Sequence, residues 1–254
     1  MAKTIKIGWL FPNMFNLHGD RGNILAIKAE GERRHYDIEI EQINLDTKNF
    51  NPLDYDFLFC PPGEMQHFKA VVAFLEPYQD KLIDFIENRP MLVTGTTISL
   101  FGKLISRNDG STINGLGIIN IETTENSAVY GDDLYYNCRY NGKELEIVGS
   151  QIQMMNVEIN EESPFGWLQY GYGNTGNTKF EGVISGKAIF TNTLGPILVG
   201  NPWLTEEIIN LIESNKGWET WEKQRNNALE SNSLTTKIAL ITKKETRLKK
   251  VSER

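Results

Sequence analysis

The sequence of 254 residues contains few of the side chains that usually bind metals or carry protons in catalysis. It has two cysteines, Cys60 and Cys138, and three histidines, His18, His35 and His67. So small a set excludes a Cys/His zinc cluster of ordinary spacing. Because no histidine follows His67, it also excludes a histidine base in the C-terminal two thirds of the chain. We expect neither a metal nor a cofactor.

Excess positive charge and long apolar runs are also absent. The formal net charge is −7, which argues against a nucleic-acid-binding surface. No stretch reaches the roughly 18 apolar residues of a membrane span, and the apolar run near the N-terminus is too short for a signal peptide. Two cysteines in a chain of this length are typical of a reducing compartment, so we expect a cytoplasmic protein.

Hydrophobic residues make up 40% of the chain, which is enough for a large folded core. In the first half of the chain, segments with the apolar or alternating pattern of a strand are separated by segments with the pattern of a helix. This order predicts an α/β fold with a mainly parallel, doubly wound sheet. The later half is rich in strands. The expected early strands are 4–10, 37–44, 55–60 and 91–94, the expected helices are 24–34, 66–88 (divided at Pro77), 96–104 and 204–214, and the expected later strands are 117–122, 134–139, 144–148, 153–159, 182–184 and 188–191.

The C-terminal segment differs in character from the rest of the chain. Residues 243–254, here called the basic tail, carry six basic and two acidic residues, so the remainder of the chain carries −11. We predict one domain over residues 1–214 and a helical extension over 215–254. The tail is interpreted as a solvated terminal helix, or alternatively as a contact for an acidic partner or a lipid surface.

A polar loop, Asn-Leu-His-Gly-Asp-Arg-Gly-Asn, follows the first expected strand, where open α/β sheets place ligand-binding loops. Asp20, Arg21, Gly22 and Asn23 are its candidate binding residues. Backbone N–H groups at a helix start and an arginine suit an anionic ligand, and an aspartate can orient the arginine. The same residues are equally consistent with ordinary capping of the following helix.

This loop and six later blocks resemble, in the same order, the glutaminase subunit of lipid II isoglutaminyl synthase. That family is a branch of the cobyric-acid-synthase-like class I glutamine amidotransferases. The later blocks are Gly102-Lys103, Gly-Leu-Gly-Ile-Ile-Asn-Ile at 115–121, Tyr-Gly-Tyr-Gly-Asn at 170–174, Glu-Gly-Val at 181–183, and the pairs Gly195-Pro196 and Asn201-Pro202. The resemblance spans roughly residues 4–212 and implies a flavodoxin-like, three-layer amidotransferase fold.

The resemblance also implies where the chemistry of glutamine hydrolysis would stand. The family uses a cysteine nucleophile on a strand-to-helix turn, and that position falls on Gly95, or on Thr94 with a shift of one residue. The family's histidine base falls on Leu194. A glycine offers no nucleophile and a leucine accepts no proton, so the two reactive side chains of such a site are missing.

Two further features of the family's site differ here. The glycine-rich loop that would stabilise an oxyanion corresponds to Pro61, Pro62 and Gly63, and proline has no N–H to donate. The arginine that would hold glutamine falls on Ala128. The combined losses predict that this chain does not hydrolyse glutamine.

Three functions remain open from the sequence. The first is a non-catalytic subunit that binds or regulates a Mur-ligase-like partner, as the resembled family's glutaminase does in modifying peptidoglycan precursors. The second is a small-molecule binding module that uses the vacated pocket, which Gly95 and Leu194 would make apolar. The third is a working amidohydrolase with Cys60 as a relocated nucleophile and His18 or Glu64 as its base.

Overall fold

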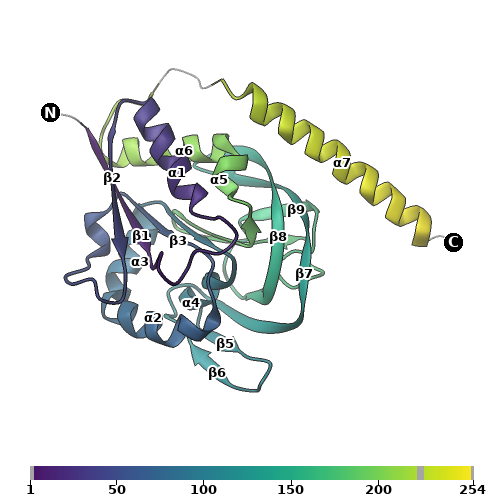
Figure 1. Ribbon diagram of the computed structural model, residues 1–254, viewed down its shortest axis with the longest axis horizontal. Helices are drawn as coiled ribbons and strands as arrows, with labels where there is room; N and C mark the ends of the chain where they lie inside the picture. The colour runs from purple at the N-terminus through teal and green to yellow at the C-terminus, as the bar shows by residue number, and fades with distance from the viewer. Residues whose placement is uncertain (1–2, 222–225, 253–254) are drawn as a thin grey trace.

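The computed structural model describes residues 3–221 and 226–252, and its centre is a six-stranded sheet (Figure 1). Neighbouring strands pair in parallel except at the edge formed by β11 and β12. In spatial order the strands are β11 (Val183–Ser185), β12 (Ala188–Thr191), β4 (Met91–Thr94), β3 (Phe57–Cys60), β1 (Thr4–Leu10) and β2 (Asp37–Ile43). The predicted mainly parallel α/β fold is therefore confirmed.

Helices cover both faces of this central sheet. The strand β3 illustrates the division, because Phe57 and Phe59 join the core on one face while Leu58 and Cys60 join the core on the other. The first face carries α1 (Gly22–Arg33), α5 (Ile197–Gly200) and α6 (Pro202–Asn215). The second carries α2 (Phe68–Leu75), α3 (Gln79–Asn88) and α4 (Ile98–Phe101), with short 3-10 turns at Pro52–Asp54, Met65–His67, Glu76–Tyr78 and Gly95–Thr97.

A second sheet is built around one long antiparallel hairpin. Its strands are β5 (Leu104–Ser106), β6 (Thr112–Asn114), β7 (Ile121–Tyr140), β8 (Lys143–Ile159), β9 (Gly166–Tyr170), β10 (Phe180–Glu181) and β13 (Thr193–Leu194). The hairpin turn lies at Asn141 and Gly142, whose φ angles of 50° and 80° fit a type I′ turn. The expectation of four separate strands between 117 and 159 was wrong, because β7 and β8 pair continuously apart from one register shift.

Two other expected elements differ from the structure. The helix expected over 96–104 ends at Phe101, because Leu104–Ser106 forms β5 and pairs with β6 and β7. The segment 117–120 is not a strand; Gly117 has a φ of 63°, and β7 begins at Ile121. Strand pairing decided the first outcome, whereas the N–H groups of residues 117–119 bond to the carbonyls of Phe101 and Gly102 at the end of α4; local periodicity reports neither kind of contact.

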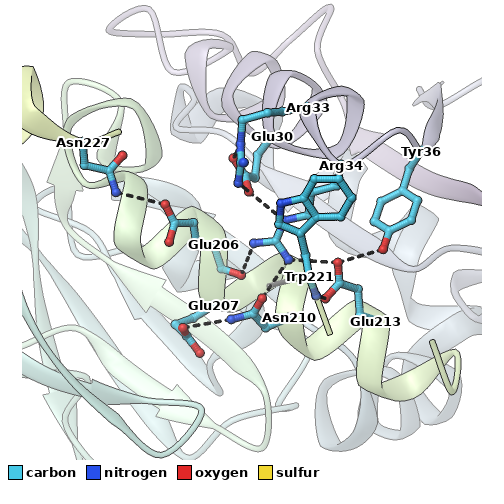
Figure 2. A network of polar contacts seen from close by, with 10 residues as sticks. All are labelled: Glu30, Arg33, Arg34, Tyr36, Glu206, Glu207, Asn210, Glu213, Trp221 and Asn227. Atoms are coloured by element: carbon cyan, nitrogen blue, oxygen red, sulfur yellow. Dashed lines mark hydrogen bonds and ion pairs between the residues drawn. The ribbon is translucent and has the colours of Figure 1, made fainter. Parts of the chain in front are cut away.

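The C-terminal part of the chain packs back on the body of the molecule. A network of polar contacts joins the end of α1 to α6 and to Trp221 (Figure 2). Beyond it, α7 (Ala228–Ser252) runs beside β7 and β8 and extends past them (Figure 1). In the part of the chain that the structure describes, no helix has the length and apolarity to span a membrane. The proposed boundary between residues 214 and 215 stays a prediction.

Candidate functional site

The turn after β4 has the backbone geometry of a nucleophile elbow. Gly95 is buried and has a φ of 65°, between the strand Met91–Thr94 and the helix Ile98–Phe101. A sharp strand-to-helix turn of this kind presents the first residue's side chain above the end of the sheet. Glycine adopts this left-handed conformation without the steric cost that a Cβ atom brings.

The fold brings together three of the positions that the sequence assigned to a glutaminase site. A Cβ atom on Gly95 would lie 3.4 Å from Cδ2 of Leu194 and 2.9 Å from Cβ of Pro62. Gly95 and Leu194 therefore face each other as a nucleophile and its base would. Their correspondence to the family's cysteine and histidine remains a prediction.

The loop of Pro61, Pro62 and Gly63 is held by two threonines of the turn. The Thr97 hydroxyl donates to the Pro61 carbonyl at 3.1 Å, and the Thr96 hydroxyl donates to the Gly63 carbonyl at 2.5 Å. The N–H of Gly63 donates to Oγ1 of Thr96 at 3.3 Å. Since the two prolines lack an N–H, the loop's only backbone donor is already hydrogen-bonded inside the protein.

Asp20 connects the two sides of this site. Its side chain is fully buried and accepts a hydrogen bond of 2.6 Å from the hydroxyl of Thr94, the residue before Gly95. The backbone N–H of Gly195, the residue after Leu194, helps to lower the pKa of this carboxyl, while Oδ1 of Asp20 has no hydrogen-bond partner among the described residues. Burial raises the pKa of Asp20 to about 6, and the groups of Thr94 and Gly195 only partly offset the loss of hydration.

The rest of the polar loop joins the first helix to the segment after Leu194. Oδ1 of Asn23 accepts the N–H of Leu198 at 2.9 Å, within the first turn of α5. Gly22 lies so close to Pro196 that a Cβ atom there would sit 2.4 Å from the proline ring. Arg21 is exposed and precedes α1 as its N-cap residue. Asn23 therefore caps a helix, and Gly22 allows close packing.

The later blocks of the resemblance bond to one another. The side-chain amide of Asn174 donates to the Gly182 carbonyl at 3.0 Å and accepts the Gly182 N–H at 2.7 Å. The buried carboxyl of Glu181 accepts hydrogen bonds from the Thr191 hydroxyl and from the Asn192 N–H. Burial raises the pKa of Glu181 to about 7. These contacts hold β12 and the approach to Leu194 in place.

Ala128 lies opposite the part of β8 that carries Met154. It is exposed on β7, in the irregular stretch between Glu125 and Tyr130 where the pairing with β8 changes register. Its role as a lost glutamine-binding position stays a prediction.

Cys60 is a poor candidate for a relocated nucleophile. Its side chain is completely buried, it bonds to Thr97, and burial raises its pKa to about 12, so its reactive thiolate is scarce near neutral pH. Cys138 is also buried, and burial likewise raises its pKa to about 12. The candidate bases His18 and Glu64 are both exposed.

A recess of about 140 Å³ opens above Gly95. The residues that define it are Leu17, His18, Pro62, Gly63, Glu64, Met65, Gly95, Thr96, Ile152, Met154 and Leu194. Cys60 is not part of its wall. No group of three or more metal-ligating side chains occurs within residues 3–221 and 226–252.

The contribution of β8 to this recess was missed in the sequence. Ile152 and Met154 are each 41% exposed, while the intervening polar residues Gln151 and Gln153 are buried. The buried amides are satisfied inside the protein; that of Gln153 donates to the Asn174 carbonyl at 2.8 Å. The run Gln-Ile-Gln-Met contained the signal, but alternation alone does not say which face of a strand is buried.

Comparison with known proteins gives two related sequences. The chain is 25% identical over 219 residues, 85% of this chain and 87% of the relative, to the lipid II isoglutaminyl synthase (glutamine-hydrolyzing) subunit GatD of Staphylococcus aureus (strain N315). It is 24% identical over 208 residues, 81% of this chain and 79% of the relative, to the GatD subunit of Streptococcus pneumoniae (strain ATCC BAA-255 / R6). The resemblance inferred from the sequence blocks is thereby confirmed.

Two solved structures are also similar to this chain. A crystal structure of a glutamine amidotransferase is 16% identical, with 81% of this chain and 98% of that chain covered and a TM-score of 0.48. The glutaminase domain of Trypanosoma brucei CTPS with bound acivicin is 10% identical, with 87% and 97% covered and a TM-score of 0.47. No protein-family model matches the chain.

Proposed function

We propose that this chain is a non-catalytic, glutaminase-like subunit of a cytoplasmic assembly that amidates the peptidoglycan precursor lipid II. One observation carries the proposal: Gly95 and Leu194 face each other across a nucleophile-elbow turn, and neither has a reactive side chain. The relatives named above are glutamine-hydrolysing subunits of lipid II isoglutaminyl synthase, which supports the pathway.

The chemistry of amide hydrolysis explains why such a site would be inactive. A nucleophile must attack the amide carbon, a base must accept its proton, and N–H donors must stabilise the oxyanion that forms. Gly95 and Leu194 can supply neither the nucleophile nor the base. Loss of a single oxyanion donor typically costs about 2.7–4 kcal/mol of transition-state stabilisation. The Gly63 N–H, bonded to Thr96, does not replace the missing donors.

The proposed partner is a Mur-ligase-like protein, which the chain would hold, stabilise or regulate. Buried contacts of Asp20 and Asn23 maintain the architecture around a site that has no reactive side chains, and this favours a retained scaffold. The ligase would take its nitrogen from another source, such as a free amine or amino acid. The basic tail is a second candidate contact for an acidic surface of the partner.

Two measurements test this function. Glutamate release from glutamine should stay at background for the wild type and equally for Cys60→Ala, whereas a higher rate in the wild type alone would establish the relocated nucleophile. Co-expression with a Mur-ligase-like protein from the same organism should give one complex in size-exclusion chromatography. A chain that elutes only as a monomer beside that ligase would contradict the proposed partnership.

The recess supports a second candidate function, that of a small-molecule binding module. It has a volume of about 140 Å³ and a mainly apolar wall, with Gly95 and Leu194 at its centre. A ligand that binds there should raise the melting temperature of the isolated chain by mass action. This function requires no ligase.

A further inference from the structure

One side of the recess is poorly suited to the polar oxygen atoms of a ligand such as glutamine. Its loop of residues 61–63 has no free backbone donor, because two members are prolines and the Gly63 N–H is bonded to Thr96. A carboxylate or carbonyl oxygen therefore gains no hydrogen bond from this loop. Burying such a group against residues 61–63 without a partner is unfavourable, so this side of the recess disfavours anionic ligands.

The wall of the recess is suited to a short hydrocarbon chain. Leu194 is buried at its centre, while Ile152, Met154 and Leu17 form an exposed apolar rim. An apolar cavity of about 150 Å³ can hold a molecule the size of benzene, and the recess is of similar size. It therefore has room for roughly four to six carbon atoms.

The charge at the recess is negative. Glu64 supplies a carboxylate, and no lysine or arginine is among the described residues that form the wall. The imidazole of His18, which also forms part of the wall, has a ring nitrogen that can accept a hydrogen bond. A cationic N–H donor complements both side chains, and the formal charge of −7 on the whole chain favours its approach.

We propose that the recess binds a primary amine with a short apolar tail, the tail on Leu194 and the ammonium group beside Glu64. This inference deepens the second candidate function by naming its ligand class. It does not depend on a ligase partner.

The test uses three probes of nearly equal shape on the full-length protein: isopentylamine, 3-methylbutanol and isovalerate. Titration followed by amide NMR should shift the signals of Gly95, Thr96 and Ile152, with affinity falling from the amine to the alcohol to the carboxylate. Glu64→Gln should lower the affinity for the amine about 1.5–5-fold, which is the range of an exposed ion pair, and should leave the affinity for the alcohol unchanged. The matched control is Glu158→Gln, which changes an exposed carboxylate on β8 outside the recess and should alter neither affinity.

A second pair of variants tests the location. Ile152→Lys places a positive charge on the exposed rim without disturbing the core, and it should abolish amine binding; Val199→Lys, at an exposed position outside the recess, should not. Equal affinity for the amine and the alcohol would contradict the proposed ligand class, but the proposal that the chain is a small-molecule binding module would stand. If no probe shifts these amides, the binding module itself is overturned, whereas the ligase partnership is judged by co-elution alone.

Discussion

Two buried carboxyl groups stand out among the individual residues of the site. Asp20 connects the turn before Gly95 to the backbone after Leu194, and Glu181 holds the end of β12. Burial raises the pKa of Asp20 to about 6 and that of Glu181 to about 7. Each group thus prefers to be protonated in the folded state, whereas in the unfolded chain it ionises near its ordinary, lower pKa.

Stability should therefore increase as the pH falls from 8 to about 5.5. In this window the folded protein takes up protons that the unfolded chain does not bind, and Asp20 and Glu181 together should add about 2–3 kcal/mol to the free energy of unfolding. The contribution is lost again as the pH rises through 6 and 7. Urea unfolding at pH 8 and at about pH 5.5 measures this difference in the free energy of unfolding.

The matched variant is Glu181→Gln, which should leave only the smaller pH dependence due to Asp20. Carboxylates with lowered pKa values, such as Glu30 and Asp132, lose their contribution only below about pH 4.5 and do not affect this window. A wild-type stability that is flat or falls from pH 8 to 5.5 would contradict the argument.

Among the secondary-structure elements, α1 and α6 are joined by a buried ionic network (Figure 2). The guanidinium of Arg34, just after α1, lies 2.7 Å from a carboxylate oxygen of Glu30 and 2.9 Å from one of Glu213 on α6. Tyr36 donates a further hydrogen bond of 2.8 Å to Glu213. Both carboxylates are fully buried, so each depends on Arg34 for compensation.

Replacing Arg34 by methionine should lower the free energy of unfolding by about 3–5 kcal/mol, because two buried carboxylates lose a cationic partner. Arg33→Met is the matched control. Its guanidinium also bonds Glu30, but its side chain is 31% exposed, so a loss of about 1 kcal/mol or less is expected. Chemical unfolding of both variants makes the comparison, and equal losses would refute the special role of Arg34.

At the scale of the whole molecule, α7 lies across the second sheet with few contacts. Lys237 pairs with Asp133 at 3.3 Å, Lys244 pairs with Asp132, and Ile241 is buried. Other apolar side chains of the helix, such as Leu240 at 58% exposure, face solvent. Lys244 belongs to the basic tail, so part of that tail binds an acidic residue of its own chain; side chains from residue 246 onward lie outside the described part.

A chain truncated after Asn227 should remain folded. Among the described residues, the truncation removes the buried Ile241 and the partly exposed ion pairs of Lys237 and Lys244, so the melting temperature should fall by less than about 8 °C with cooperative unfolding retained. Differential scanning calorimetry measures this, with Lys237→Ala as a variant that loosens α7 without removing it. Loss of cooperative unfolding on truncation would show that the helix is part of the core and would contradict a separate extension over 215–254.

The sequence alone was sufficient for the central sheet, because apolar runs such as 4–10 and 91–94 are local patterns that local physics follows. It also shows that no histidine follows His67, and it predicts that Gly95 and Leu194 stand at the positions of a nucleophile and a base. Composition and residue order determine such absences without reference to a fold.

Only the tertiary structure decided how these positions meet. The contact between Gly95 and Leu194 joins residues 99 positions apart, and β8 completes the recess with Ile152 and Met154. The continuous β7–β8 hairpin and the early end of α4 likewise follow from pairing between distant strands. Such contacts depend on loop closure and on which strand face becomes buried, and neither is visible in a local window of sequence.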